Sequence, residues 1–576
     1  APQEFSYLIL VLLVVSFVKL NMLDSLKLFI LSIPFFVALP ANAFSDSMSI
    51  WRVLIIALFL KAGWEKYKNY HSNKNYHSES VRQAQDRPVS GSISNRSLTC
   101  SQLVKQSIKR IGRNGGNIQK ILKQVRSDRK QIRNNKINKL FLLTIIFFVI
   151  ASISLISAQD IGAGIKKMLF LLNIFLLFPV VIFTIKNECD LSEILKAVLY
   201  SSVIIVFIGY FQFISTFFIA LSQFWYFWTD NVIKAFYGQN LSHLLSYSNT
   251  WFSYYKSLPP TLRMFSVLPD SHSFAMIIII SIPVVLSSLF LFKGKQKKYI
   301  SIALMFFLLA IFFSGSRGAW VGSVFALTAG LFLFLSSSAK RKSNSKFEKA
   351  CSIISEFIEL LKSRVGFNLD IRNNSKYYSK LIAFSVLLFF VLMPVSSLIL
   401  KQNQETQIMR SNISLSDYER SKFSMLERAF SISDLDETSN KGRIQIWQET
   451  LVSISEHPFL GVGFGNFNYV LGENATALKK GSSAHSIYLD ITAEIGIFGL
   501  IIFLFLIMEI LKMAYTLYFK TEKKYLKIFA GSFFIYFVWI CAYGIFDVVI
   551  FNDKVLMFTV IIIGMLYTLD RIMHNV

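Results

Sequence analysis

"SFAMIIIISIPVVLSSLFLF", residues 273–292, is an apolar run without a single charged side chain. An α-helix needs about 20 predominantly apolar residues to cross the hydrocarbon core of a bilayer. This run has that length, so it predicts a transmembrane helix. The basic stretch "KGKQKK" follows at 293–298, and a second apolar run occupies 299–314. The two runs predict a pair of membrane helices joined by a short basic turn.

The whole chain shares this character. Of its 576 residues, 53% are hydrophobic and 56 are phenylalanine, which is too apolar for an ordinary soluble domain. We therefore predict an all-α polytopic membrane protein with about 12–13 transmembrane helices and a large, mostly helical periplasmic loop. The predicted spans lie at 5–20, 26–43, 50–64, 139–157, 167–185, 195–219, 273–292, 299–314, 319–336, 380–400, 485–511, 527–547 and 554–570.

Charge orients these spans. The formal net charge is +26, and the basic residues collect between the apolar runs. The segment 65–138 holds 17 Lys/Arg against 4 Asp/Glu, and 337–379 holds 9 against 4. The turns 293–298 and 520–527 are also basic. All four segments fall on one side of the predicted membrane, and the positive-inside rule makes that side cytoplasmic.

The opposite, external side carries two long segments, 220–272 and 401–484. The second is nearly neutral, with 9 Lys/Arg against 10 Asp/Glu. The N-terminus is predicted to be external and the C-terminus cytoplasmic. The predicted regions are N-terminal membrane helices at 1–64, a basic, partly disordered cytoplasmic insert at 65–138, a membrane core at 139–400 that includes the periplasmic segment 220–272, a large periplasmic loop at 401–484, and C-terminal membrane helices at 485–576.

The basic insert 65–138 has two halves. The first is rich in Ser, Asn and charged residues, a composition typical of disorder. The second has Ile and Leu at helical spacing among basic residues, which fits either a helix on anionic lipid headgroups or a solvated tether. Residues 346–365 predict another amphipathic helix, against the inner leaflet.

The cysteines are scattered, with no CxxC pair and no metal-binding spacing, so they predict neither a disulfide framework nor a zinc site. They are Cys100, Cys189, Cys351 and Cys541. The first apolar run, 5–20, lacks the basic start of a signal peptide, and two further spans follow closely. We therefore interpret it as a membrane helix.

The turn "SGSRGAWVG", 314–322, places Arg317 at the external end of two membrane helices. A charge at the edge of a membrane span is costly and often marks a functional site. Gly315 and Gly318 allow close packing or the approach of a ligand to the backbone. The alternative is an arginine that reaches the lipid headgroups.

A second stretch, "NKGRIQIWQETLVSISEHPFLGVGFGNF" at 440–467, carries Arg443. A helix is predicted from Ile444 to Ser455, ended by Pro458. The following loop contains Gly463 and Gly465 but matches neither a P-loop nor GxGxxG. Its backbone amides could hold phosphate oxygens, although a flexible turn explains the glycines equally simply.

The third stretch, "SSAHSIYLDITAEIGIFGL" at 482–500, places His485 where an external loop enters a membrane helix. A histidine can act as a base or an anion ligand near neutral pH, or simply cap a helix. Asp490 and Glu494 follow one turn apart and are candidates to support His485 or to pair with a lysine or arginine.

A fourth stretch, "LPPTLRMFSVLPDSHSFAMI" at 258–277, brings Arg263, Asp270 and His272 to the entrance of the run quoted first. Of the seven histidines, His485 is the one placed to meet Arg317 and Arg443, and Arg263 is a candidate member of this cationic cluster.

In order and spacing, these stretches resemble the O-antigen ligase family, a superfamily of bacterial membrane glycosyltransferases that includes O-antigen polymerases and protein O-oligosaccharyltransferases. The resemblance rests on "SGSRGAW" (314–320), "GRIQIW" and "HPFLGVGFGNF" (442–467), and "AHSIYLDITAEIGIFGL" (484–500). It covers roughly residues 139–570 and leaves out the basic insert.

The resemblance implies a multi-pass protein of the bacterial inner membrane whose site faces the periplasm. It implies a glycan donor linked to undecaprenyl pyrophosphate and an inverting transfer that uses neither a metal nor another cofactor. In the ligase proper, the acceptor is a sugar hydroxyl of lipid A–core. By the same resemblance, the catalytic candidates are Arg317, Arg443 and His485, and the substrate-binding candidates are Arg263, Gly463, Gly465, Asp490 and Glu494.

The alternative functions are those of a polysaccharide polymerase, a solute transporter and a nucleic-acid-binding protein. A polymerase of O-antigen or exopolysaccharide would use the same donor with a growing polysaccharide as acceptor. Such polymerases often carry an arginine with a glycine eleven positions later in external loops, and neither 220–272 nor 401–484 contains this pair. A solute transporter is less favoured, because the charges gather at the external surface. Nucleic-acid binding is rejected, because the basic insert has few aromatic residues for stacking bases.

Overall fold

The computed structural model describes residues 4–39, 49–85, 139–238, 242, 251–255, 258–338, 375–411, 438–471 and 483–575. Apart from one two-stranded hairpin, the regular structure of these residues is helical. The chain divides into two compact units, one made of Ala1–Gly63 and Phe147–Val576 and the other of Trp64–Ile146. The predicted amphipathic helix at 346–365 and the basic second half of the insert lie outside the described residues.

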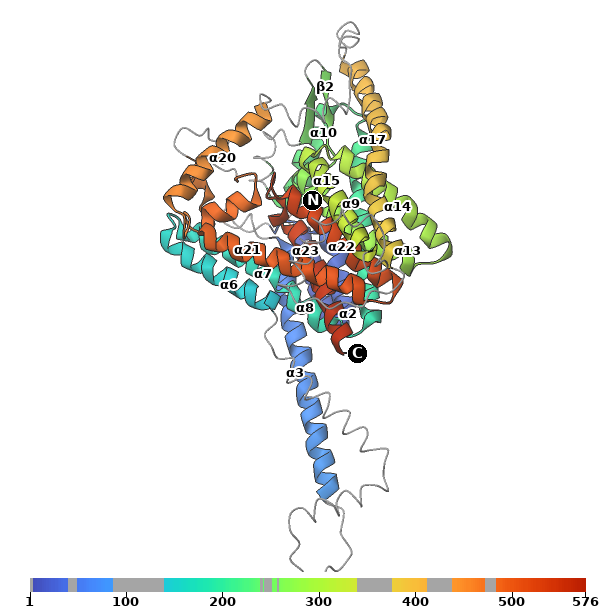
Figure 1. Cartoon of the computed structure of the whole chain (residues 1–576), viewed down its shortest axis with the longest axis vertical. Helices are drawn as coiled ribbons and strands as arrows, with labels where there is room; N and C mark the ends of the chain where they lie inside the picture. Colours follow the sequence, from blue (N-terminus) through green and yellow to red (C-terminus); the bar gives the residue numbers. More distant parts are fainter. Residues whose placement is uncertain are drawn as a thin grey trace, which may run out of the picture. The chain divides into compact units, whose positions relative to one another are not determined.

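Ten helices in the described part of the chain are long and apolar enough to cross a membrane, which confirms the predicted all-α polytopic class (Figure 1). They match the last ten predicted spans. They are α6 (Lys139–Ser154) with η2 (Leu155–Ser157), α7 (Ile161–Phe175) with α8 (Leu177–Thr184), α9 (Glu188–Ser215), α13 (Ser271–Leu291), α14 (Gly294–Phe313), α15 (Arg317–Ser338), α17 (Ser375–Ser411), α21 (Ile487–Lys520), α22 (Lys524–Tyr543) and α23 (Asp553–Asn575).

The first three predicted spans are helical but are not among these ten. α1 (Glu4–Lys19) and α2 (Met22–Ser32) are short, and η1 (Ile33–Phe35) follows at Pro34. α2 packs against α9. α3 (Ile50–Gln85) is longer than the predicted 50–64 and continues into the first half of the basic insert as far as Gln85. No glycine or proline lies between residues 64 and 85, so neither of these helix-breaking residues stops the helix there.

α13, the helix quoted first, is the most buried span, with 83% of its most apolar window inside the protein. It packs against α22, α14 and α9, and α22 also contacts α15 and α21. A helix buried on all sides is apolar all round, which explains the uniform sequence. Gly322 lets α15 approach α22 closely, because a Cβ there would lie 2.6 Å from the Trp539 ring.

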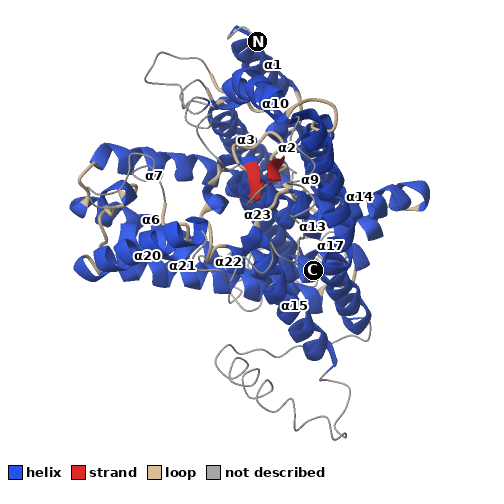
Figure 2. Ribbon diagram, turned by 90° about the horizontal axis from the view of Figure 1, so that it is seen from above, coloured by secondary structure: helices blue, strands red, loops and turns tan. Residues whose placement is uncertain are grey.

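The segment before α13, which was predicted to be external, folds onto the bundle. It contains α10 (Leu221–Phe227), η3 (Trp228–Ile233), α11 (Lys234–Tyr237) and the antiparallel strands β1 (Phe252–Tyr255) and β2 (Leu258–Leu262), drawn in red in Figure 2. Just after β2, the Met264 amide donates to the Phe313 carbonyl over 2.8 Å. This bond fixes the hairpin to the turn between α14 and α15.

The other segment that was predicted to be external contains α20 (Thr438–Glu456). This helix confirms the one predicted at 444–455 and starts earlier, so that Arg443 lies inside it. The loop after α20 packs on a kink in α21. The Val462 amide donates to Ala493 O over 2.8 Å, and the Ile497 amide donates to Pro458 O over 2.9 Å. Short η7 (Phe467–Tyr469) follows the loop.

The kink in α21 depends on Gly496, whose φ of 71° is a conformation that almost only glycine adopts. A Cβ at this position would also overlap the Phe459 carbonyl. We expect Gly496→Ala to destabilise the protein by at least about 1–3 kcal/mol, the usual cost of such backbone strain. The measurement is the melting temperature of the detergent-solubilised protein. The control is Gly63→Ala, where a Cβ meets nothing within 4 Å. Equal melting of the two variants would contradict the assignment of the kink.

Candidate functional site

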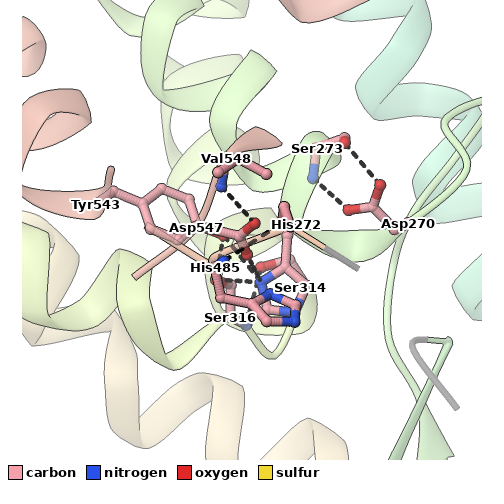
Figure 3. Close-up of polar contacts among 10 residues, drawn as sticks. Asp270, His272, Ser273, Ser314, Ser316, His485, Tyr543, Asp547 and Val548 are labelled. Atoms are coloured by element: carbon pink, nitrogen blue, oxygen red, sulfur yellow. Dashed lines mark hydrogen bonds and ion pairs between the residues drawn. The ribbon is translucent and has the colours of Figure 1, made fainter. Parts of the chain in front are cut away.

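Five membrane helices bring one of their ends to a common place. These ends are the start of α13, the turn from α14 to α15, the start of α21 and the segment after α22. Figure 3 shows the polar side chains that meet there, with His272 among Ser316, His485 and Asp547. The site therefore lies at one end of the membrane bundle, where helix termini and loops can hold polar groups.

His272, in the first turn of α13, is the centre of this cluster. Its ring Nδ1 lies 3.2 Å from Asp547 Oδ2, 3.1 Å from the Tyr543 hydroxyl and 3.2 Å from Ser316 Oγ. The hydroxyls of Ser316 and Tyr543 are themselves 2.5 Å apart. The His272 side chain is 18% exposed and that of Asp547 is 9% exposed. The His272 side chain is therefore more accessible to solvent than the Asp547 carboxylate, which is nearly buried.

All four of the predicted cationic residues lie close enough to act electrostatically on the His272 ring. They are Arg263, Arg317, Arg443 and His485. Two of them, Arg263 and His485, lie in loops, Arg317 begins α15, and Arg443 lies in α20, so the structure brings together residues up to 222 positions apart in the sequence (Arg263 to His485, 485 − 263). Their roles in binding or catalysis stay predictions.

The turn at Arg317 shows why two glycines flank this arginine. Gly315 has a φ of 63°, and a Cβ there would meet the Arg263 side chain at 3.2 Å and Ser253 Oγ at 3.1 Å. Arg263 Nε in turn donates to Ser253 Oγ over 3.0 Å. At Gly318, a Cβ would lie 2.8 Å from the Tyr543 ring. The glycines thus let Arg263 and Tyr543 pack against the turn that carries Arg317.

Two carboxylates lie near these cations. Asp270 caps α13, accepting from the Ser273 amide and from the Ser273 hydroxyl, each over 2.7 Å. Asp547 accepts from the Val548 amide over 2.8 Å. Burial raises the pKa of Asp270 to about 6, and burial also raises the pKa of Asp547 to about 6, although the charge of Arg443 acts in the opposite direction. Both groups are mainly ionised at neutral pH.

His485 is held by a strained loop. Its φ of 48° is uncommon for a residue with a side chain and marks a position whose geometry the surroundings impose. The adjacent Ala484 is fixed from two sides, since its amide donates to Asp490 Oδ1 over 3.1 Å and its carbonyl accepts from Trp447 Nε1 over 2.9 Å. Burial, with the nearby charge of Arg443, lowers the pKa of His485 to about 4, so its imidazole is neutral at neutral pH.

Asp490 and Glu494 face Lys167 of α7. Lys167 Nζ lies 2.5 Å from Glu494 Oε2 and 3.8 Å from Asp490 Oδ2, and it also lies 4.9 Å from the centre of the Phe464 ring. Of the alternatives that the sequence left open, the pairing with a lysine is the one observed. Asp490 supports the loop of His485 through Ala484, and a direct contact of either carboxylate with substrate stays a prediction.

Gly463 and Gly465 lie in the packed loop before η7. Their φ angles are 95° and 79°, and a Cβ on either would press on the segment that begins α7, at Ala158 for Gly463 and at Gly164 for Gly465. The positive φ angles and this contact account for both glycines. Phosphate binding by the loop stays a prediction.

Sequence reasoning gave no role to Asp547, Tyr543 or Ser316, and it noted His272 without assigning one. The signal for Asp547 was present, because "YGIFDVV" at 543–549 places a carboxylate at the end of an apolar run. Nothing in the sequence shows which of the seven histidines this carboxylate would meet. Within the described residues, no group of three or more His, Cys, Asp or Glu side chains is arranged to hold a metal ion.

The fold and the position of this cluster define a multi-pass membrane protein with a charged site at the ends of its helices. Residues 300–504 match the family model described as O-antigen ligase, so the chain carries an O-antigen ligase domain. The enzymes of this family, ligases and polymerases, transfer glycans. The match contains Arg317, Arg443 and His485, whereas His272 and Asp547 lie outside it. No curated protein matches the chain significantly.

The contacts of Lys167 predict a stability effect. Removing one member of a buried ion pair leaves the partner charge uncompensated, which typically costs about 3–5 kcal/mol. We expect Lys167→Met to lower the melting temperature strongly, and addition of Glu494→Gln to recover part of the loss. The neighbouring exposed Lys166, changed to Met, is the control. If Lys167→Met and Lys166→Met melt alike, the ion pair does not stabilise the loop of His485.

Proposed function

We propose that this protein is an O-antigen ligase-type glycosyltransferase. It would move a glycan from undecaprenyl pyrophosphate to a sugar hydroxyl of lipid A–core. The observation that carries the proposal is the convergence of Arg263, Arg317, Arg443 and His485 on one place at the ends of the membrane helices. Three of these residues belong to the O-antigen ligase domain.

The chemistry explains why arginines gather there. In the transfer, the bond between the anomeric carbon and the pyrophosphate oxygen breaks, and negative charge develops on the leaving group. Guanidinium groups stay charged at all physiological pH values and can bind two oxygens at once. Fixed in a partly buried site, they stabilise the transition state more than water does. The pyrophosphate is already a good leaving group, so we propose a metal-independent, inverting displacement that needs no cofactor.

The location of the site supports access from the membrane. The start of α13 and the turn after α14 lie at the opposite end of these helices from the basic turn at 293–298, which the positive-inside rule assigns to the cytoplasm. We therefore propose that the site faces the periplasm of a bacterial inner membrane. A donor with a polyprenyl tail would keep the tail in the lipid and present its diphosphate at the helix ends.

The acceptor distinguishes the ligase from its relatives. A polymerase would place a second lipid-linked glycan, rather than lipid A–core, opposite the donor. We favour the ligase because the external segments lack the arginine and glycine, eleven positions apart, that polymerases of the O-antigen type often carry. Both reactions would use the same arginines.

We expect Arg317→Ala, Arg443→Ala and His485→Ala each to reduce glycan transfer by at least about 100-fold, the usual cost of removing a group that stabilises developing charge. The measurement is restoration of the glycolipid profile in a source strain lacking the protein, with membrane levels checked by immunoblot. The control is Arg571→Ala, an exposed arginine at the end of α23. Normal transfer by all three site variants would refute the proposed site.

The same deletion strain separates ligase from polymerase. Loss of all O-chains from lipopolysaccharide, with long glycans still on undecaprenyl pyrophosphate, is the expected result. Lipid A–core capped with a single repeat would indicate a polymerase instead. An unchanged lipopolysaccharide ladder would exclude lipid A–core as the acceptor.

A further inference from the structure

The contact between His272 and Asp547 has the geometry of a histidine oriented by a carboxylate. Asp547 Oδ2 lies 3.2 Å from His272 Nδ1, and the other oxygen of the same carboxylate accepts from the Val548 amide. No residue in the described part of the chain hydrogen-bonds to the opposite ring nitrogen, Nε2. Nδ1 is thus engaged, and the His272 side chain as a whole is 18% exposed.

The carboxylate determines which ring nitrogen carries the proton. An ionised carboxylate can only accept a hydrogen bond, so Nδ1 must donate to it and Nε2 keeps its lone pair. Asp547 is mainly ionised at neutral pH, as its pKa of about 6 requires. The hydroxyls of Tyr543 and Ser316 border the same nitrogen and, through their own 2.5 Å contact, hold the ring in place.

We propose that His272 is the general base of the transfer and that Asp547 is its positioning residue. This inference rests on the proposed function. Nε2 would take the proton of the acceptor hydroxyl while the hydroxyl oxygen forms its bond to the anomeric carbon. The bond from that carbon to the pyrophosphate oxygen breaks, and its electron pair leaves with the pyrophosphate. The proton remains on Nε2, and the Asp547 carboxylate stabilises the imidazolium.

His272 and His485 have different surroundings, and these indicate different roles for the two side chains. The arginines proposed to hold the diphosphate all act electrostatically on the His272 ring, so the ring belongs to the same charged cluster. No carboxylate in the described part of the chain contacts the ring of His485. That ring lies near Arg443 and has a pKa of about 4. A neutral imidazole there can donate one hydrogen bond to a phosphate oxygen. We therefore assign His485 to the diphosphate and His272 to the acceptor.

The test uses the full-length protein in nanodiscs, with a glycan on undecaprenyl pyrophosphate as donor and purified lipid A–core as acceptor. For His272→Gln we expect kcat to fall by about 10²–10⁴-fold, the usual contribution of a general base, with little change in the affinity for undecaprenyl pyrophosphate. Arg443→Ala is the matched comparison, because it should lose that affinity. Retained binding by His272→Gln also shows that the variant is folded.

The pH profile tests the role of Asp547. Because its carboxylate is ionised only above a pKa of about 6, the wild-type rate should fall as pH decreases through about 6. Asp547→Asn should be slow at every pH and lack this inflection, since an amide can donate to Nδ1 and favour the wrong tautomer. The groups that face this pair from the neighbouring elements are Arg263, Asp270, Arg317, Arg443, His485 and Tyr543.

The outcomes separate this inference from the proposed function. Wild-type protein that does not transfer glycan from this donor to either lipid A–core or a second lipid-linked glycan refutes the function itself. If the wild type transfers, near-normal kcat in His272→Gln overturns the inference and leaves the function intact. Loss of undecaprenyl pyrophosphate binding in His272→Gln, to the extent seen in Arg443→Ala, also overturns it, because His272 would then be a diphosphate ligand.

Discussion

Positive charge gathered at the end of a membrane bundle is the constraint on which this structure depends. Arg263, Arg317 and Arg443 all act on the same imidazole ring, and like charges so placed repel one another in a medium that screens them poorly. Among the described residues, Asp547 and Asp270 are the carboxylates that share their surroundings. A cluster that contains three arginines suits an anionic, lipid-linked donor, whose diphosphate would bring negative charge to it.

The scaffold holds this charge through close backbone approaches. The turn that carries Arg317 is fixed by Met264 on one side and is packed by Tyr543 on the other, and glycines make both contacts possible. α13 and α22, the two most buried spans, supply His272 and Tyr543 from their ends. A rigid core thus extends directly into the site, and little movement of its polar groups is needed when charge develops.

Much of this arrangement follows from the sequence, for physical reasons. A long uncharged run has few alternatives to a membrane helix, so the ten long spans could be predicted. The N-terminal runs 5–20 and 26–43 were also predicted as helices, and α1 and α2 lie there, but neither is among the ten helices long and apolar enough to cross a membrane. Arg317, Arg443 and His485 were predicted to meet because each is a charged or titratable residue at an external helix end. The pairing of Lys167 with Glu494 could not be predicted, because a single sequence gives no sign of a contact between residues 327 positions apart.

The site residues inside the matched segment 300–504 and those outside it have different proposed roles. The O-antigen ligase domain at 300–504 contains Arg317, Arg443 and His485, the groups proposed to bind the donor diphosphate. His272 precedes the domain and Asp547 follows it, yet α13 and α22 bring them together within 3.2 Å. Three of the four proposed donor-binding residues therefore lie in the matched segment, with Arg263 before it, and the residues proposed to activate the acceptor lie in its flanks. An enzyme that keeps one donor and changes its acceptor can vary these flanks while the arginines stay in place.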